Sequence, residues 1–303
     1  MSEKIKISDK IILIITALLL ILYCLSFTKS CSSTDKREVV KSALVNQKYA
    51  EDIDAFQFIQ GNSVLLLSKK NGMWYVDSSE IQNISLPADN ERVNRFIADL
   101  ISIQEMYKLS DTIDENSSFG LDDQDTFTLR YYTGVNFKDI IFGNKDFALS
   151  SRYMMSGKST AVFEISNVFD KYLSTATQLW TEPYIISQQI LGPIKESDIQ
   201  RTFVTFDNVT KQTDFDSKLL ELRHGGFPSA YSYKKEMFEN SLMSIKLELG
   251  NKNNIELSIA QSENNNEQEF NVKTSYFADG KEIYRSYSKI SGWTYNKIKE
   301  IML

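Results

Sequence analysis

His224 is the only histidine in the 303-residue chain, and it stands in the segment Arg-His-Gly-Gly-Phe-Pro. A single histidine cannot supply a metal site built from several histidines, and neither Cys24 nor Cys31 lies near it in the sequence. A serine–histidine–acid triad would have to use His224, but the chain has no Gly-x-Ser-x-Gly motif to present the serine. The sequence therefore indicates a loop histidine rather than a metal or nucleophilic centre.

Asp122, Asp123 and Asp125 form the densest acidic group of the chain. A calcium loop needs alternating oxygen ligands, a turn glycine and a later glutamate, whereas this group runs directly into an expected strand. A solvated turn is the favoured interpretation. A hydrolase with paired carboxylates stays open as an alternative, because the spacing of such a pair is set in space rather than in sequence.

The chain also lacks the glycine-rich motifs that hold nucleotide phosphates, both Gly-x-Gly-x-x-Gly and the Walker pattern. We therefore expect no catalytic, metal-binding or cofactor-binding residues and no cofactor, and we expect that the protein is not an enzyme. Aromatic residues make up 12% of the chain. Tyr131-Tyr132, Tyr184 and Tyr231-Ser232-Tyr233 could face a glycan or a partner, but tyrosine in strands usually packs half-buried on a sheet.

Composition places the elements that must position these residues in a globular body. Hydrophobic residues are 42% and charged residues 24% of the chain, which excludes a disordered chain, a collagen-like fibre and a multi-span membrane protein. The net charge of −6 has two unlike parts. Residues 1–41 hold seven basic and four acidic residues, so the rest holds 27 basic and 36 acidic residues, a balance of −9. Nucleic acid is therefore not an expected partner.

The segment 11–27 is apolar and without charge, and as a helix it would span roughly 26 Å, near the lower limit for a bilayer core. We predict an uncleaved signal-anchor transmembrane helix within residues 1–30, which would contact membrane lipid through residues 11–27, followed by a polar stalk at 31–49. A cleaved signal peptide and a lipoprotein are alternatives. Ser26-Phe27-Thr28 is a poor cleavage site. A lipoprotein needs small residues just before a cysteine, and neither Leu22-Tyr23 before Cys24 nor Lys29-Ser30 before Cys31 fits this pattern well.

Lysines flank both sides of this segment, so the charge count does not decide its orientation. A short N-terminal tail before a single apolar helix usually leads to export of the rest of the chain. We therefore expect a single-pass protein of the inner (cytoplasmic) membrane with an extracytoplasmic C-terminal body.

Short apolar runs separated by turn residues predict a meander of strands in the first part of the body, at 56–59, 64–67 and 74–76. Asp89 is a plausible N-cap for the clearest helix. The apolar residues of that helix recur at helical spacing, as Val93, Phe96, Ile97, Leu100 and Ile101. This stripe is expected to pack on the neighbouring strands.

Two later regions have the same order of four strands and a helix. The first has strands at 127–131, 137–142, 152–156 and 161–165 before a short helix after Ser166. The second has strands at 245–249, 255–259, 270–276 and 281–287 before a helix after Ser291. One more strand near Phe203 and Phe206 and a short helix at 216–223 are expected between them.

We predict an α+β fold with two antiparallel sheet-plus-helix units that repeat one pattern. The alternative is two unrelated layers that look alike. The predicted domains are 50–188 and 195–303, separated by the break at Leu191-Gly192-Pro193.

Several motifs of the first unit occur in a specific order over roughly residues 53–185. They are Trp74-Tyr75-Val76, Pro87-Ala88-Asp89, Phe119-Gly120-Leu121-Asp122, Ile141-Phe142-Gly143, Arg152-Tyr153 and Val162-Phe163. In these motifs the chain resembles the family called domain of unknown function 4340. It departs from the family pattern at Leu179-Trp180-Thr181, where relatives tend to have a basic-acidic cluster.

The resemblance implies a membrane-anchored, extracytoplasmic bacterial protein, often a companion of ABC transporters of the gliding-motility type. No catalytic residues are known for the family, so none is carried over. We expect a binding or scaffold protein with protein partners in a membrane complex, an accessory subunit of an ABC-type transport or envelope complex. The alternative is a periplasmic or surface module that binds a glycan or peptide without a transporter partner.

Overall fold

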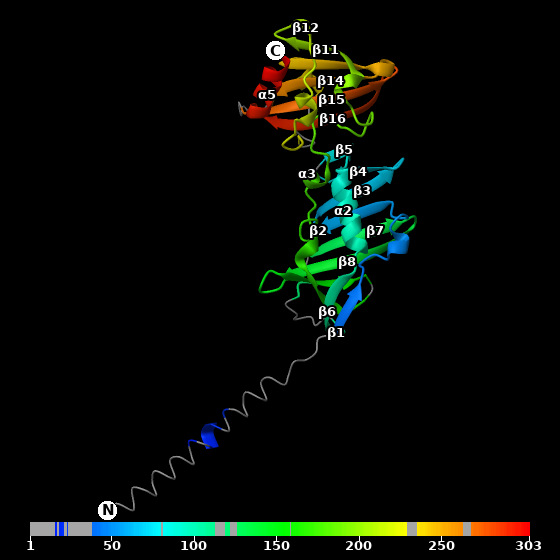
Figure 1. Cartoon of the computed structure of the whole chain (residues 1–303), viewed down its shortest axis with the longest axis vertical. Coiled ribbons are helices and arrows are strands. Elements are labelled where there is room, and N and C mark those ends of the chain that lie inside the picture. The colour runs from blue at the N-terminus through cyan, green and yellow to red at the C-terminus, as the bar shows by residue number, and fades with distance from the viewer. Residues whose placement is uncertain are drawn as a thin grey trace, which may run out of the picture.

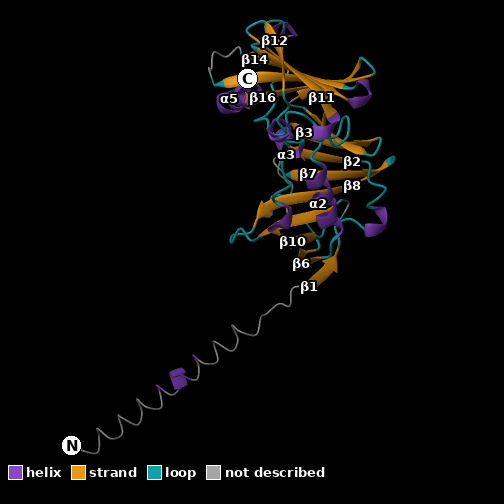
Figure 2. Cartoon of the chain, turned by 45° about the horizontal axis from the view of Figure 1, so that its top comes forward, coloured by secondary structure: helices purple, strands orange, loops and turns teal. Residues whose placement is uncertain are grey.

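The computed structural model describes residues 38–79, 81–112, 119–121, 126–157, 159–228, 235–262 and 268–303, with Thr16, Leu18 to Leu20 and Tyr23. In this part of the chain the fold is mostly β, with two antiparallel sheets and few helices (Figures 1 and 2). The predicted anchor at 11–27 lies almost entirely outside the described residues. Within them, no helix has the length and apolar character needed to cross a membrane.

The larger sheet has ten strands in the order β1-β6-β10-β9-β8-β7-β2-β3-β4-β5. In chain order they are β1 (Glu38–Ser42), β2 (Ala55–Gln60), β3 (Ser63–Lys70), β4 (Met73–Ser78), β5 (Ile81–Pro87), β6 (Gln104–Ser110), β7 (Phe127–Thr133), β8 (Asn136–Lys145), β9 (Ser151–Ser156) and β10 (Val162–Ser166). The sheet therefore contains two four-strand meanders, β2 to β5 and β7 to β10. They lie side by side and are joined by the pairing of β2 with β7.

The smaller sheet has six strands in the order β12-β11-β13-β14-β15-β16. They are β11 (Ile199–Phe206), β12 (Val209–Thr213), β13 (Met243–Leu249), β14 (Asn254–Gln261), β15 (Glu269–Ala278) and β16 (Lys281–Ser291). The helical segments are α2 (Asn90–Ile101), α3 (Thr177–Trp180), α4 (Lys218–Glu221) and α5 (Gly292–Met302), with single 3₁₀ turns η1 (Gln47–Tyr49), η2 (Asn167–Phe169), η3 (Glu196–Asp198), η4 (Lys235–Phe238) and η5 (Gly250–Lys252).

Helix α2 begins as the sequence predicts. The Asp89 side chain accepts the backbone N–H of Arg92 at 3.0 Å, which satisfies one of the free donors of the first turn. Val93, Phe96 and Leu100 are fully buried, and α2 lies across one face of the ten-stranded sheet (Figure 1). The Phe96 ring meets that of Phe56 at 5.1 Å between centroids. The predicted packing of the helix on the strands is confirmed.

The alternation of apolar residues decides which face of the large sheet is covered. On β2 and β3 the residues Phe56, Phe58, Leu65 and Leu67 are fully buried, and the residues between them are only half-buried. Because successive strand residues point to opposite faces, one face forms the core under α2 and α3.

The structure adds strands that the sequence patterns do not predict. Strands β1, β5, β6 and β12 are absent from the prediction, and β1 uses residues assigned there to a polar stalk, since Val39 pairs with Tyr107 of β6. The helix predicted after Ser166 is reduced to the turn η2 and a further turn. On α5 the buried residues are Thr294, Ile298 and Met302, whereas Trp293 is 72% exposed. Among the described residues of the first sheet, the meander β2 to β5 leads directly into a regular helix, α2, whereas β7 to β10 leads into the turn η2.

Each sheet has its own hydrophobic core. The first core uses buried residues from Val45 to Trp180, and the second begins at Ile185 and ends at Met302. The division into domains at 50–188 and 195–303 stays a prediction. Direct hydrogen bonds join the two parts: the Tyr284 hydroxyl of β16 donates to the Ser85 carbonyl of β5 at 2.9 Å. Two edge strands, one from each sheet, thus meet at this junction.

Candidate functional site

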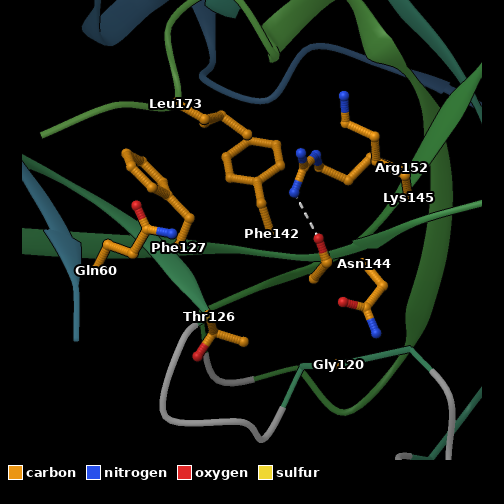
Figure 3. Close-up of a pocket in the computed structure, with 10 residues that line it drawn as sticks. Gln60, Gly120, Thr126, Phe127, Phe142, Asn144, Lys145, Arg152 and Leu173 are labelled. Atoms are coloured by element: carbon orange, nitrogen blue, oxygen red, sulfur yellow. Dashed lines mark hydrogen bonds between the residues drawn. The ribbon is translucent and has the colours of Figure 1, made fainter. Parts of the chain in front are cut away.

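An open pocket of about 300 Å³ lies beside strands β7, β8 and β9 (Figure 3). Its polar lining comes from Gln60, Thr126, Asn144, Lys145 and Arg152, and its apolar lining from Phe127, Phe142 and Leu173. Gly120 and Gly143 complete the wall. The described lining therefore combines two cations and three neutral polar side chains with an apolar floor, and no carboxylate is among these described residues.

Arg152 is fixed at the edge of this pocket by two hydrogen bonds. Its Nε donates to Asp170 Oδ1 at 2.8 Å. Its Nη1 donates to the carbonyl oxygen of Gly143 at 2.6 Å, the bond dashed in Figure 3. Lys145 Nζ contacts the other Asp170 oxygen at 2.7 Å. Burial would raise the pKa of Asp170, but the hydrogen bonds and charges of Lys145 and Arg152 outweigh it and lower the pKa. Two cations thus share one ionised carboxylate.

Two glycines set the shape of the pocket wall. A Cβ on Gly143 would lie 2.2 Å from the carbonyl oxygen of Phe119, so only glycine lets the 119–121 segment approach β8 this closely. At Gly120, φ is +62°, and a Cβ would meet Asn144 at 2.5 Å. The backbone N–H of Asn144 donates to the same Phe119 carbonyl at 2.7 Å, which fixes the approach.

The turn between β8 and β9, residues 146–150, lies next to the pocket and is held by one carboxylate. Asp146 Oδ1 accepts the backbone N–H groups of Ser150 at 2.8 Å and Ser151 at 2.9 Å. Asp146 Oδ2 accepts the N–H of Ala148 and the hydroxyl of Ser150. The hydrogen bond from the Ser151 backbone, and then those from Ser150 and Ala148, lower the pKa of Asp146 against a smaller effect of burial. The ionised form of Asp146 therefore organises the turn.

This organised turn presents two large apolar side chains to water. Phe147 is fully exposed, at 105% of its reference area, and Leu149 is 63% exposed in the left-handed region with φ +57°. The carbonyl of Leu149 accepts the Asn167 side-chain amide at 3.3 Å. Burying such a phenylalanine side chain is worth about 1.5–3 kcal/mol. We call residues 146–150 the apolar turn.

His224 lies at the junction between the sheets rather than in a free loop. Its Nε2 is 2.9 Å from the backbone carbonyl of Glu182, to which only a protonated Nε2 can donate, and its Nδ1 is buried without a hydrogen-bond partner among the described residues. The ring packs on Phe227 at 4.6 Å between centroids. Burial lowers the pKa of His224 despite the hydrogen bond to Glu182. The residue is a packed, neutral histidine.

Glu182 is the buried carboxylate of this junction. It accepts the Ser187 hydroxyl at 2.5 Å and the Gln188 N–H at 2.9 Å, and burial raises its pKa more than these bonds lower it. The cavity that Glu182 lines with His224 measures only about 20 Å³. It is therefore large enough for about one water molecule and too small for a substrate.

The remaining candidates from the sequence fall in different places. Asp122, Asp123, Asp125, Tyr231 and Tyr233 lie outside the described residues. Tyr131 is buried, the Tyr132 hydroxyl bonds to Gln57, and the Tyr184 ring lies under Arg223. Across the described ranges, no group of three or more His, Cys, Asp or Glu side chains could hold a metal ion.

Sequence reasoning missed both parts of the candidate site. Arg152 entered only as part of a family motif, and its partner Asp170 lies 18 residues further along the chain. Phe147 and Leu149 did carry a signal, since two apolar residues in a polar hairpin turn are unusual. This signal is the segment Asp-Phe-Ala-Leu-Ser at 146–150, which places phenylalanine and leucine between two predicted strands.

Comparison with known proteins places the chain in a family. No curated protein and no solved structure matches it. The profile of the domain of unknown function DUF4340 matches residues 74–225, which is half of the chain. The match includes α2, the described pocket lining except Gln60, the apolar turn and His224. The chain belongs to the DUF4340 family.

Proposed function

We propose that the protein is a membrane-anchored, extracytoplasmic scaffold that binds a protein partner through the apolar turn. The proposal rests on Phe147 and Leu149, whose side chains are exposed while hydrogen bonds to Asp146 fix the backbone of their turn. Single exposed apolar residues are ordinary on a protein surface. Here two of them share a turn whose backbone is already ordered, so a partner that buries them loses little conformational entropy on binding.

The proposed partner is a subunit of an ABC-type transport or envelope complex, and the proposed anchor is the segment 11–27 in the inner membrane. The apolar, uncharged character of that segment supports the anchor. Belonging to a family whose members resemble companions of gliding-type transporters supports the partner. A reporter fused after Leu303 that is active only in the cytoplasm would contradict this topology.

The test of the docking role is purification of the tagged full chain from membranes in mild detergent. We expect a transporter subunit to co-purify with the wild type and to be lost from the double variant Phe147→Ser, Leu149→Ser. Val135→Ser is the matched control, because Val135 is 97% exposed in another hairpin turn of the same sheet. Recovery of the wild type as a lone monomer would refute the role, as would equal losses in the double variant and the control.

A module that binds a ligand without a transporter partner is the second candidate function. The pocket beside β7, β8 and β9 is the observation that favours it, since open pockets with convergent polar groups are the usual form of a ligand site. This function predicts saturable ligand binding by the purified chain with no other protein present.

We also infer that the strand-and-helix units repeat one ancestral pattern. Strands β13 to β16 lead directly into α5 through the N-cap Ser291, and β2 to β5 lead into α2 through the N-cap Asp89. The sequence pattern aligns residues 127–166 with residues 245–291. In the structure, residues 55–101 are the better counterpart of the C-terminal unit, because there too four strands lead directly into a regular helix. Alignment of many family members over both regions tests the inference, and unrelated residue profiles would contradict it.

A further inference from the structure

We propose that the pocket beside β7, β8 and β9 binds a small organic anion, a carboxylate or a phosphate monoester attached to an apolar body. This inference is independent of the docking role proposed for the apolar turn. It rests on the charge, the free donors and the shape of the pocket.

The described part of the pocket wall carries positive charge, whereas the protein as a whole is negative. The body after residue 41 has a balance of −9, yet the described residues of the pocket lining include Lys145 and Arg152 and neither Asp nor Glu. Asp170 is the carboxylate that contacts both cations, and its lowered pKa keeps it ionised near neutral pH. Among the described residues, these two positive charges exceed the single negative charge of Asp170, and a bound anion would neutralise the excess.

The Arg152 guanidinium is fixed in position and, among the described residues, still has an unused hydrogen-bond donor, Nη2. Its Nε and Nη1 are engaged by Asp170 and Gly143, and no described residue accepts a hydrogen bond from its Nη2. An arginine fixed in this way binds an oxyanion without first losing side-chain freedom. Lys145 has three N–H donors, and its 2.7 Å contact with Asp170 occupies one of them. Both cations can therefore donate to the same ligand group.

The apolar floor defines the rest of the ligand. Phe127, Phe142 and Leu173 line the pocket, and Figure 3 shows Phe142 and Arg152 directed at the same space. A fully hydrated inorganic ion would leave this floor uncovered, whereas an aromatic or aliphatic body would bury it. The volume of about 300 Å³ is at the small end of ligand sites and suits a single ring or a short chain.

The experiment measures binding of three probes to the purified full chain in detergent by saturation-transfer NMR and calorimetry. Phenylacetate and phenyl phosphate carry the two possible anions, and phenylacetamide is the neutral isostere of the first. We expect at least one anion to bind saturably at millimolar or lower concentration. Phenylacetamide should bind about tenfold more weakly, as the loss of a charged hydrogen bond predicts. The stronger of the two anions identifies the headgroup.

Variants then locate the binding. Lys145→Gln and Arg152→Gln should each weaken the anion about tenfold. Lys138→Gln, on an exposed position of the same strand β8, should leave binding unchanged. Both cations contact Asp170, but Arg152 also donates to the Gly143 carbonyl and is only 18% exposed. The decisive variant is therefore Lys145→Gln, because the Lys145 side chain is 42% exposed and its removal disturbs the structure less. Absence of saturable binding by either anion would overturn the proposal, as would equal binding of phenylacetamide or equal effects of Lys145→Gln and Lys138→Gln.

Discussion

Replacing Trp180 by alanine should destabilise the first sheet strongly. The side chain is fully buried at the end of α3, and its ring meets that of Phe58 at 4.6 Å and that of Phe96 at 5.3 Å between centroids. The indole N–H donates to the Ser174 carbonyl at 3.1 Å. Trp180 thus joins the strands, helix α2 and the returning chain in one contact.

The size of the effect depends on the contacts that the substitution removes. A buried tryptophan covers about 150–250 Å² of apolar surface, which at about 25 cal/mol per Å² gives an upper bound of about 4–6 kcal/mol. Measured losses for Trp→Ala in cores are about 3–5 kcal/mol. We therefore expect about 4 kcal/mol, a large share of the roughly 5–15 kcal/mol by which domains are usually stable. Trp180→Phe keeps a ring in place and should lose less.

The assay is urea denaturation followed by far-UV circular dichroism, a signal that does not depend on the fluorophore being replaced. Trp293→Ala is the matched control, because Trp293 is 72% exposed and its removal should change the free energy of unfolding by about 0.5 kcal/mol or less. Equal destabilisation by Trp180→Ala and Trp293→Ala would contradict this expectation. So would a loss below about 1 kcal/mol for Trp180→Ala, since burial would then not control stability here.

Three further outcomes are expected. Gly143→Ala should lose about 1–3 kcal/mol of stability in denaturant titrations, because its Cβ would lie 2.2 Å from the Phe119 carbonyl, whereas Gly250→Ala, with nothing closer than 3.8 Å, should lose less. Asp146→Ala should keep the fold but speed hydrogen exchange at the amides of Ser150 and Ser151, and unchanged exchange rates would contradict the role of its carboxylate. Because burial lowers the pKa of His224 in the folded state, the unfolded state takes up its proton first, so stability should fall as pH drops below about 6.5, by at most about 1.4 kcal/mol per pH unit. Stability curves at several pH values for wild type and His224→Gln check this, and identical pH dependence would refute it.

Local pattern was sufficient for the elements that form from neighbouring residues. The N-cap at Asp89 and the apolar stripe of α2 follow from helical spacing alone, and both are confirmed. The hairpins β7–β8 and β15–β16 follow from turn residues between alternating runs; the turns place Gly134 at φ +61° and Gly280 at φ +77°. These features depend on short-range geometry, which the sequence specifies directly.

Strands that find their partners far along the chain could not be predicted in this way. Strand β6 has a polar alternation, Gln-Glu-Met-Tyr-Lys-Leu-Ser, and it pairs with β1 and β10 at the far edge of the sheet after α2 has crossed it. Its only buried residue is Met106, which is still 6% exposed. Such a strand is stabilised by the sheet edge it completes and not by its own apolar content.

The amino-acid sequence was sufficient to predict the acidic body, the antiparallel meanders and the main helix. It also showed how few groups the chain has for metal or nucleophilic chemistry. The candidate site could not be predicted from the sequence, because it is created by tertiary packing. The pocket contacts form because the chain after β10 returns beside β8, which brings Asp170 to Lys145 and Arg152. Phe147 is exposed because Asp146 fixes its turn. Periodicity reports which face of an element is buried, whereas a pocket depends on which elements meet, and that is a property of long-range packing.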